Sequence, residues 1–160
     1  MIKEIGFISN FCISCQNFMH LNWNYQIPMY HNLIYIKLTL KKNHTEKWKR
    51  LLEVLNHCPK LQNLTIHEDS GHGYEILDNW MDPMIVPECL STQLRTCLFK
   101  DYKNTESEIQ FAKYILQNSK VLNTMSIMSD TSLDQNAKYQ MVTKLTSSRR
   151  ASTTCELFFY

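Results

Sequence analysis

The chain has 160 residues, of which 44% are hydrophobic and 20% are charged, and its formal net charge at pH 7 is +2. This length fits one packed domain with a continuous core, and the small basic excess is far below what neutralising the phosphates of a nucleic-acid duplex requires. Only three glycines are present, too few to expect a glycine-rich loop that holds phosphate groups. Composition therefore argues against nucleic acid as a partner and against nucleotide chemistry.

The N-terminal segment 1–7 contains Glu4 and too short an apolar run to act as a secretory signal, and no later stretch is apolar for long enough to cross a bilayer. We therefore expect a protein of the cytoplasm or nucleus with no membrane partner. In those compartments the six cysteines are expected to be reduced thiols. Cys97 and Cys155 fit this expectation, because they fall on inward positions of predicted strands, where free cysteine packs as a small apolar side chain.

Cys12 and Cys15 have the spacing of a zinc-ligand pair. A structural zinc site needs a second pair of ligands with comparable spacing. The nearest candidates for that second pair are poor ones, namely His57 with Cys58 or His67 with His72. We interpret Cys12 and Cys15 as ordinary thiols, and we predict no metal and no other cofactor.

A repeated apolar pattern is the strongest signal along the chain. In each copy a large apolar residue is followed by two variable residues, an apolar residue, one variable residue and a third apolar residue, which is typical of leucine-rich repeats. The copies occupy 33–38, 61–66, 94–99 and 122–127. Their starts lie 28, 33 and 28 residues apart, at or slightly beyond the upper end of the roughly 20 to 29 residues of such repeats. Each copy predicts one strand.

The two ends of the array are less regular. Segment 18–23 also fits the pattern, but it begins only 15 residues before Leu33. Cys155, Leu157 and Phe159 alternate as the inward residues of a final strand would.

Between the copies the apolar spacing changes from two residues to about 3.6, which predicts helices. The first helix follows Thr45 and should end before Pro59. The second opens with a capping box at 105–108, in which Thr105 and Glu108 each bind a free backbone amide. Segment 132–135 has the same capping-box pattern and predicts the start of a third helix, which should end near Ser147. The inward stripes of the three helices are, in order, Trp48, Leu51, Leu52 and Leu55; Ile109, Ala112, Ile115 and Leu116; and Ala137, Met141 and Leu145. No helical period is found between Glu68 and Gln93, which predicts a long irregular connection.

Alternating strands and helices favour an α/β fold with a parallel sheet. The units are short and similar, so we predict a leucine-rich-repeat-like solenoid with its helices on the outer face, and a compact α/β layer is the alternative. Because side chains alternate across a strand, Ile36, Leu38 and Leu40 should point into the core. The residues between them should line an exposed concave face. That parity exposes Tyr35, Lys37 and Thr39; Asn63, Thr65 and His67; Thr96, Leu98 and Lys100; and Thr124, Ser126 and Met128.

The second half of the chain resembles a known family. The matching positions are Trp80, Pro83, the run Val86-Pro87-Glu88-Cys89-Leu90, Leu94, Tyr102, Glu106, Glu108, the run 114–118, Leu122, Met125, Ile127, Met141, Leu145, Arg149, Ser152, Cys155, Leu157 and Phe159. This pattern resembles the FBD domain, the C-terminal module of many plant F-box proteins with a leucine-rich-repeat array. Asn104 stands where relatives commonly have a glycine, and asparagine also tolerates the left-handed conformation.

The resemblance divides the chain into a terminal leucine-rich-repeat-like segment, 1–79, and an FBD domain, 80–160. In such proteins the F-box binds the Skp adaptor of a ubiquitin ligase and the repeats bind a target. No segment before Phe18 resembles an F-box, so binding of the Skp adaptor is not expected. A solenoid that starts within its array lacks a polar capping repeat, so we expect poor order or aggregation in 1–22.

The sequence does not predict an enzyme. No spacing brings a nucleophile together with its base and an orienting group, and the nearest candidate, 69–73, has the composition of a turn. The resemblance instead implies a non-catalytic protein-interaction module, like the substrate-recognition part of an F-box ubiquitin-ligase subunit, with a protein target of unknown identity. We expect Tyr35, Lys37, His67 and Lys100 to bind that target. The alternative is a truncated remnant without a ligase role, which would compete for the targets of full-length relatives.

Overall fold

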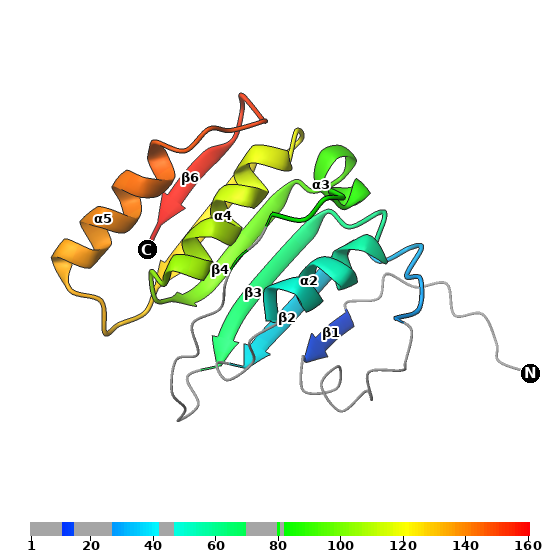
Figure 1. The fold of residues 1–160 in the computed structure, drawn as a ribbon, viewed down its shortest axis with the longest axis horizontal. Helices are drawn as coiled ribbons and strands as arrows, with labels where there is room; N and C mark the ends of the chain where they lie inside the picture. Colours follow the sequence, from blue (N-terminus) through cyan, green and yellow to red (C-terminus); the bar gives the residue numbers. More distant parts are fainter. Residues whose placement is uncertain (1–10, 15–26, 42–46, 70–79, 81) are drawn as a thin grey trace, which may run out of the picture.

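The computed structural model describes residues 11–14, 27–41, 47–69, 80 and 82–160. These residues form one six-stranded sheet in which neighbouring strands are parallel and follow the order of the sequence. The strands are β1 (Phe11–Ser14), β2 (Tyr35–Lys41), β3 (Asn63–Asp69), β4 (Thr96–Tyr102), β5 (Thr124–Ser129) and β6 (Glu156–Phe159). The described helices are α2 (Lys47–Asn56), α3 (Glu88–Thr92), α4 (Glu106–Asn118) and α5 (Gln135–Thr146). Figure 1 shows the helices gathered on one face of the sheet.

The predicted α/β class with a parallel sheet is confirmed. Each of the four repeat copies provides a strand, from β2 to β5, and the leucine that opens each copy is buried just ahead of that strand. The leucine-rich-repeat-like solenoid stays a prediction. The copy at 18–23 lies entirely outside the described residues. Most of the N-terminal segment expected to be poorly ordered, namely 1–10 and 15–22, also lies outside them.

Strand β1 was not predicted. It is only four residues long and pairs with β2, Phe11 opposite Ile36. Phe11, Cys12 and Ile13 are three consecutive apolar residues, so the segment shows no alternation of apolar and polar residues that would mark it as a strand.

The hydrophobic core lies between the sheet and the helices. The inward residues of β2, Ile36, Leu38 and Leu40, are buried as predicted, and the helical stripes of α2 and α4 pack against the same core. Phe111 of α4 is at the centre of an aromatic cluster. Its ring stacks on Trp48 with centroids 4.7 Å apart, and the edge contacts of Trp80 and Phe99 lie at 5.6 and 6.2 Å. Because Trp48 and Phe111 come from the predicted segments 1–79 and 80–160, the two segments share this core, and the boundary between them stays a prediction.

Helices α2 and α4 lie where the sequence predicts them. The capping box of α4 is formed in both directions: Glu108 N donates to Thr105 Oγ1 at 3.4 Å, and Thr105 N donates to Glu108 Oε2 at 2.9 Å. These two bonds satisfy amides that would otherwise lack partners at the start of the helix.

The start of α5 differs from the prediction. The expected capping box at 132–135 is wrong, because Asp134 is the N-cap and its Oδ1 accepts from Ala137 N at 2.7 Å. An ionised carboxylate is a strong acceptor for a helix amide, so the helix begins after the aspartate. Met141 and Leu145 are buried as predicted, but Ala137 is only half-buried.

The predicted absence of a helix between Glu68 and Gln93 is also wrong. The short helix α3 follows Pro87 and buries Cys89 and Leu90. Five residues are fewer than two helical turns, so no period could be detected in the sequence. Proline just before the helix is the local signal that this region offered.

Two residues of the β4–α4 region have a positive φ. Asn104 has φ 60°, which confirms the left-handed conformation predicted for it, and Asp101 has φ 52°. Asp101 lies where the register between β4 and β5 shifts, between Phe99 and Tyr102. None of the described helices has both the length and the apolar character that a membrane span needs.

Candidate functional site

The sheet face opposite the described helices is formed by rows of side chains that run across the strands. We call it the polar sheet face. One row is Lys37, Thr65, Leu98, Ser126 and Phe158, a second is Tyr35, Asn63, Thr96, Thr124 and Glu156, and a third contains Thr39, His67 and Lys100. The parallel pairing therefore brings side chains from distant parts of the sequence next to one another.

The four predicted binding residues lie on this face. Tyr35 and Lys37 come from β2, His67 from β3 and Lys100 from β4, so they occupy three neighbouring strands. All four are half-buried. The structure thus groups them as the strand parity predicted, and their role in binding stays a prediction.

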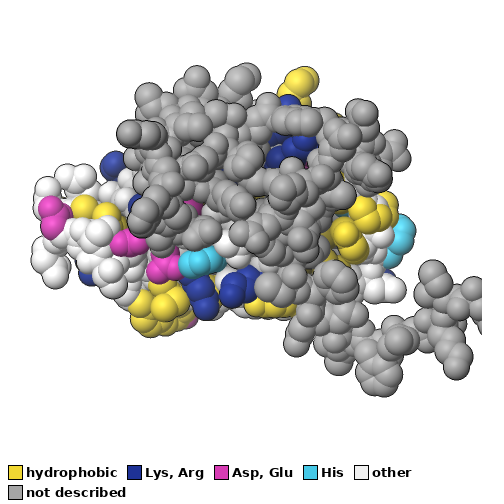
Figure 2. Space-filling model, turned by 90° about the horizontal axis from the view of Figure 1, so that it is seen from below, with side chains coloured by type: hydrophobic (Ala, Val, Ile, Leu, Met, Phe, Trp, Pro, Cys, Tyr) yellow, Lys and Arg dark blue, Asp and Glu magenta, His cyan; other side chains and the backbone are white. Residues whose placement is uncertain are grey.

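His67 has a close acidic neighbour that the sequence did not reveal. Its Nδ1 lies 2.8 Å from Asp101 Oδ2, which is an ion-pair contact when the imidazole is protonated, and the two side chains are 30% and 46% exposed. The left-handed backbone of Asp101 accompanies the shift in strand register. Aspartate is one of the residue types that tolerate this conformation, but the sequence does not mark which aspartate adopts it. Figure 2 shows charged side chains of both signs beside a histidine on the face seen from below.

Thr65 lies on the predicted face but is less exposed than predicted. It was expected to be exposed, but only 7% of its surface is accessible. Thr65 is short, and its neighbours in the row are the longer side chains of Lys37 and Leu98. Asn63 and Thr96, in the next row, are joined by a hydrogen bond of 2.7 Å from Thr96 Oγ1 to Asn63 Oδ1.

The β5–β6 side of the polar sheet face is more apolar than the β2–β4 side. Met128 is 42% exposed and Phe158 is 39% exposed, and Leu98 is half-buried in the same row as Phe158. Charged, hydrogen-bonding and apolar groups therefore lie side by side on one sheet face. Protein interfaces likewise combine apolar and polar groups.

The described cysteines do not form a reactive site. Cys58, Cys89, Cys97 and Cys155 are free and buried, and burial raises the pKa of the Cys58 and Cys89 thiols to about 12. Neutral thiols are poor nucleophiles and poor metal ligands. Within the described ranges, no three His, Cys, Asp or Glu side chains are grouped so that they could hold a metal ion. The side chains of Cys12 and Cys15, and the candidate turn after Asp69, lie outside the described residues.

Among the described aspartates and glutamates, Glu108 has the pKa most strongly altered by its surroundings. Burial, with a smaller contribution from the nearby Glu68 carboxylate, raises its pKa from 4.5 to about 7. Such a shift can mark a catalytic acid, but this carboxylate accepts from the backbone amides of Lys103 and Thr105 and from the Thr105 hydroxyl. Glu68 in turn pairs with Lys47. We therefore interpret the Glu108 cluster as a structural support for the start of α4.

Comparisons with known proteins agree with the resemblance seen in the sequence. Residues 82–127 match the family model of the FBD domain. Two Arabidopsis thaliana proteins with FBD-associated F-box protein in their names are 36% identical over 126 residues and 34% identical over 125 residues, covering 70% and 78% of this chain. An F-box/FBD/LRR-repeat protein of the same plant is 33% identical over 129 residues and covers 80% of this chain.

The chain spans less than a third of each of these relatives, namely 29%, 29% and 28% of their lengths. No solved structure matches the chain. The predicted resemblance to the FBD domain of plant F-box proteins is thus confirmed by the match over 82–127 and by the related proteins.

Proposed function

We propose that this chain, whose residues 82–127 match the FBD family, is a non-catalytic protein-binding module that holds a polypeptide target on its polar sheet face. The observation that carries the proposal is the grouping of Tyr35, Lys37, His67 and Lys100 on three neighbouring strands. Tyrosine is one of the residue types that supply much of the binding energy in protein interfaces, and charged side chains add electrostatic complementarity. The names of the related proteins place an FBD domain together with an F-box, which supports a role in target recognition.

The charges on this face indicate the chemistry of the target. Lys37 and Lys100, on β2 and β4, are two cations on the face, and His67 becomes a third charge when protonated. The acidic groups are Asp101, at the margin next to His67, and Glu156, at the far end of the face on β6. The β5–β6 side adds exposed apolar area from Met128 and Phe158. A target segment that combines acidic and apolar residues would fit both parts of the face.

A two-hybrid screen of an Arabidopsis complementary-DNA library with the whole chain as bait tests this proposal. Interacting clones are then retested with a variant in which alanine replaces four residues of the polar sheet face. These residues are Tyr35, Lys37, His67 and Lys100. We expect that variant to lose its partners, with affinities lowered more than about tenfold because contacts at the centre of an interface are removed.

The chain offers a control of matched composition outside the polar sheet face. Its four exposed residues are His31, Lys120, Tyr139 and Lys144, again one tyrosine, two lysines and one histidine. The control alanine variant should keep every partner. Equal binding by the two variants would contradict the site, and circular dichroism of both shows that folding is unchanged.

The proposal assigns target binding, and not adaptor binding, to these 160 residues. A pull-down with a purified Skp adaptor should therefore not retain the chain. Stoichiometric retention would contradict this part of the proposal. We further propose that the chain acts in the cytoplasm or nucleus, which the location of a fluorescent fusion checks.

A further inference from the structure

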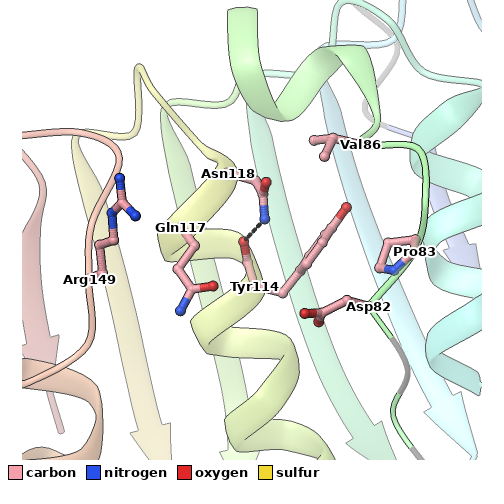
Figure 3. Close-up of a pocket in the computed structure, with 7 residues that line it drawn as sticks. All are labelled: Asp82, Pro83, Val86, Tyr114, Gln117, Asn118 and Arg149. Atoms are coloured by element: carbon pink, nitrogen blue, oxygen red, sulfur yellow. Dashed lines mark hydrogen bonds between the residues drawn. The ribbon is translucent and has the colours of Figure 1, made fainter.

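A cavity of about 480 Å³ lies on the helix side of the molecule, away from the polar sheet face. It is lined by Asp82, Pro83, Val86, Tyr114, Gln117, Asn118 and Arg149. Figure 3 shows its three parts: the loop before α3, the second half of α4, and Arg149 from the segment after α5. Its volume falls within the roughly 300–1,000 Å³ of common ligand pockets.

One wall of the cavity continues into an exposed apolar run. Met84, Ile85 and Val86 are 102%, 74% and 39% exposed. Three consecutive exposed apolar side chains are uncommon in loops and are typical of contact surfaces. The start of this loop is anchored, because Trp80 packs on Phe111 and its Nε1 donates to Asp82 Oδ1 at 2.7 Å.

The opposite wall presents a cation. Arg149 and Arg150 are adjacent, but they differ in their contacts. Arg150 Nη1 donates to Cys155 O at 2.9 Å and supports the turn before β6. Arg149 is exposed, lines the cavity, and has no hydrogen bond or ion pair with any part of the chain that the structure describes. An exposed guanidinium beside a cavity is available for a carboxylate.

The floor between the walls carries primary amides. Gln117 is exposed. Asn118 also lines the cavity, and its Nδ2 donates to Tyr114 O at 2.8 Å, so its carbonyl oxygen remains as an acceptor. A primary amide can both donate to and accept from a peptide group. The floor therefore suits a polypeptide backbone.

We propose that this cavity binds a short extended peptide segment, with an acidic side chain paired to Arg149 and a bulky apolar side chain packed on Val86 and on the exposed Met84 and Ile85 beside it. Asp82 lies at the apolar wall and would repel the acidic side chain there, so the peptide has one preferred direction. A phosphate-rich ligand is disfavoured, because the lining has one cation and one opposing carboxylate. This site is separate from the proposed function, because it lies on the other side of the sheet.

Panning a phage library of random dodecapeptides against the folded 160-residue chain tests the proposal. We expect enriched peptides to share an Asp or Glu a few residues from Leu, Ile, Met or Phe. The most enriched peptide is then synthesised, and its affinity is measured by fluorescence anisotropy for the wild type, Arg149→Glu and the control Arg95→Glu. Arg95 is likewise exposed but does not line the cavity.

Arg149→Glu should weaken binding by about tenfold or more, because a charge-assisted bond is replaced by repulsion, and Arg95→Glu should leave the affinity nearly unchanged. A peptide with lysine in place of its acidic residue should bind Arg149→Glu better than the wild type. Replacing the acidic residue of the peptide by its amide tests the same contact without changing the protein. The proposal would be overturned if no peptide is enriched or if the enriched peptides lack acidic residues. It would also be overturned if Arg149→Glu and Arg95→Glu change the affinity for the peptide equally.

Discussion

The two sides of the sheet differ in what their side chains do. On the helix side, large side chains are buried around Phe111, and even a carboxylate, Glu108, is enclosed and hydrogen-bonded. On the polar sheet face, Tyr35, Lys37, His67 and Lys100 are only half-buried. The difference indicates that folding free energy comes mainly from the helix side, whereas the polar sheet face is free to vary for recognition. Substitutions on the two sides should therefore change different measurements.

The largest effect on stability is expected at the centre of the aromatic cluster. Phe111→Ala removes a fully buried ring that contacts Trp48, Trp80 and Phe99. We expect the free energy of unfolding to fall by about 3–5 kcal/mol, measured by urea denaturation. Tyr139→Ala, at a side chain that is 71% exposed on α5, should change it by less than about 0.5 kcal/mol. Similar losses for the two variants would contradict a core centred on Phe111.

A second effect is expected from the pH dependence of stability. The pKa of Glu108 is raised from 4.5 to about 7 in the folded chain, so the folded state holds a proton that the unfolded state has released. Glu108 therefore favours folding at low pH, and this stabilisation is lost as the pH rises from about 4.5 to about 7. Glu108→Gln keeps a neutral side chain, so the variant should gain about 1–3 kcal/mol relative to the wild type between pH 4.5 and pH 8.

Thermal unfolding of the wild type and Glu108→Gln across this pH range measures the difference. Other groups titrate in both proteins, so only the difference between the two curves is compared. A constant difference between the curves would show that Glu108 has an ordinary pKa.

A smaller effect is expected at the turn before α4. Asn104 has φ 60°, a conformation that glycine adopts without strain and alanine does not. Asn104→Ala should therefore be about 1 kcal/mol less stable than Asn104→Gly. Both variants lose the 3.4 Å bond from Asn104 Nδ2 to Ala137 O, so their difference isolates the backbone contribution. Equal stability of the two would exclude a left-handed residue at this position.

The smallest effect is expected at Tyr114, whose hydroxyl is buried without a hydrogen-bond partner among the described residues. Burial, reinforced by the Asp82 carboxylate, raises the pKa of Tyr114 to about 12. Tyr114→Phe keeps the ring and removes the unsatisfied hydroxyl, so stability should rise or stay the same, within about 1 kcal/mol. A clear loss of stability in urea denaturation would reveal a partner for this hydroxyl.

The sequence predicts most of the sheet because each repeat copy buries alternate side chains, a pattern that does not depend on distant residues. Helices α2 and α4 were also predictable, from apolar stripes and from the capping box at Thr105. Helix α3 was not, because its five residues are too few for a period. The left-handed Asn104 was predicted only through the resemblance to the FBD family.

Strand parity predicted which residues of the candidate site share one face of the sheet. It did not predict their exposure or their contacts with neighbouring side chains. Parity placed Tyr35 and Lys37 on the same face, but the exposure of Thr65 depends on the longer side chains beside it in the neighbouring strands. The contact between His67 and Asp101 depends on a local shift in register. The cavity joins 82–86, 114–118 and Arg149, which only the folded chain brings together.

Lysine footprinting with a partner from the screen tests most directly whether the polar sheet face binds the target. The chain is acetylated with and without the partner, and the modification of each lysine is measured by mass spectrometry. We expect the partner to slow acetylation of Lys37 and Lys100, whereas Lys144, exposed on α5, should react at the same rate. Unchanged rates at Lys37 and Lys100, together with protection confined to the helix side, would contradict recognition by the polar sheet face.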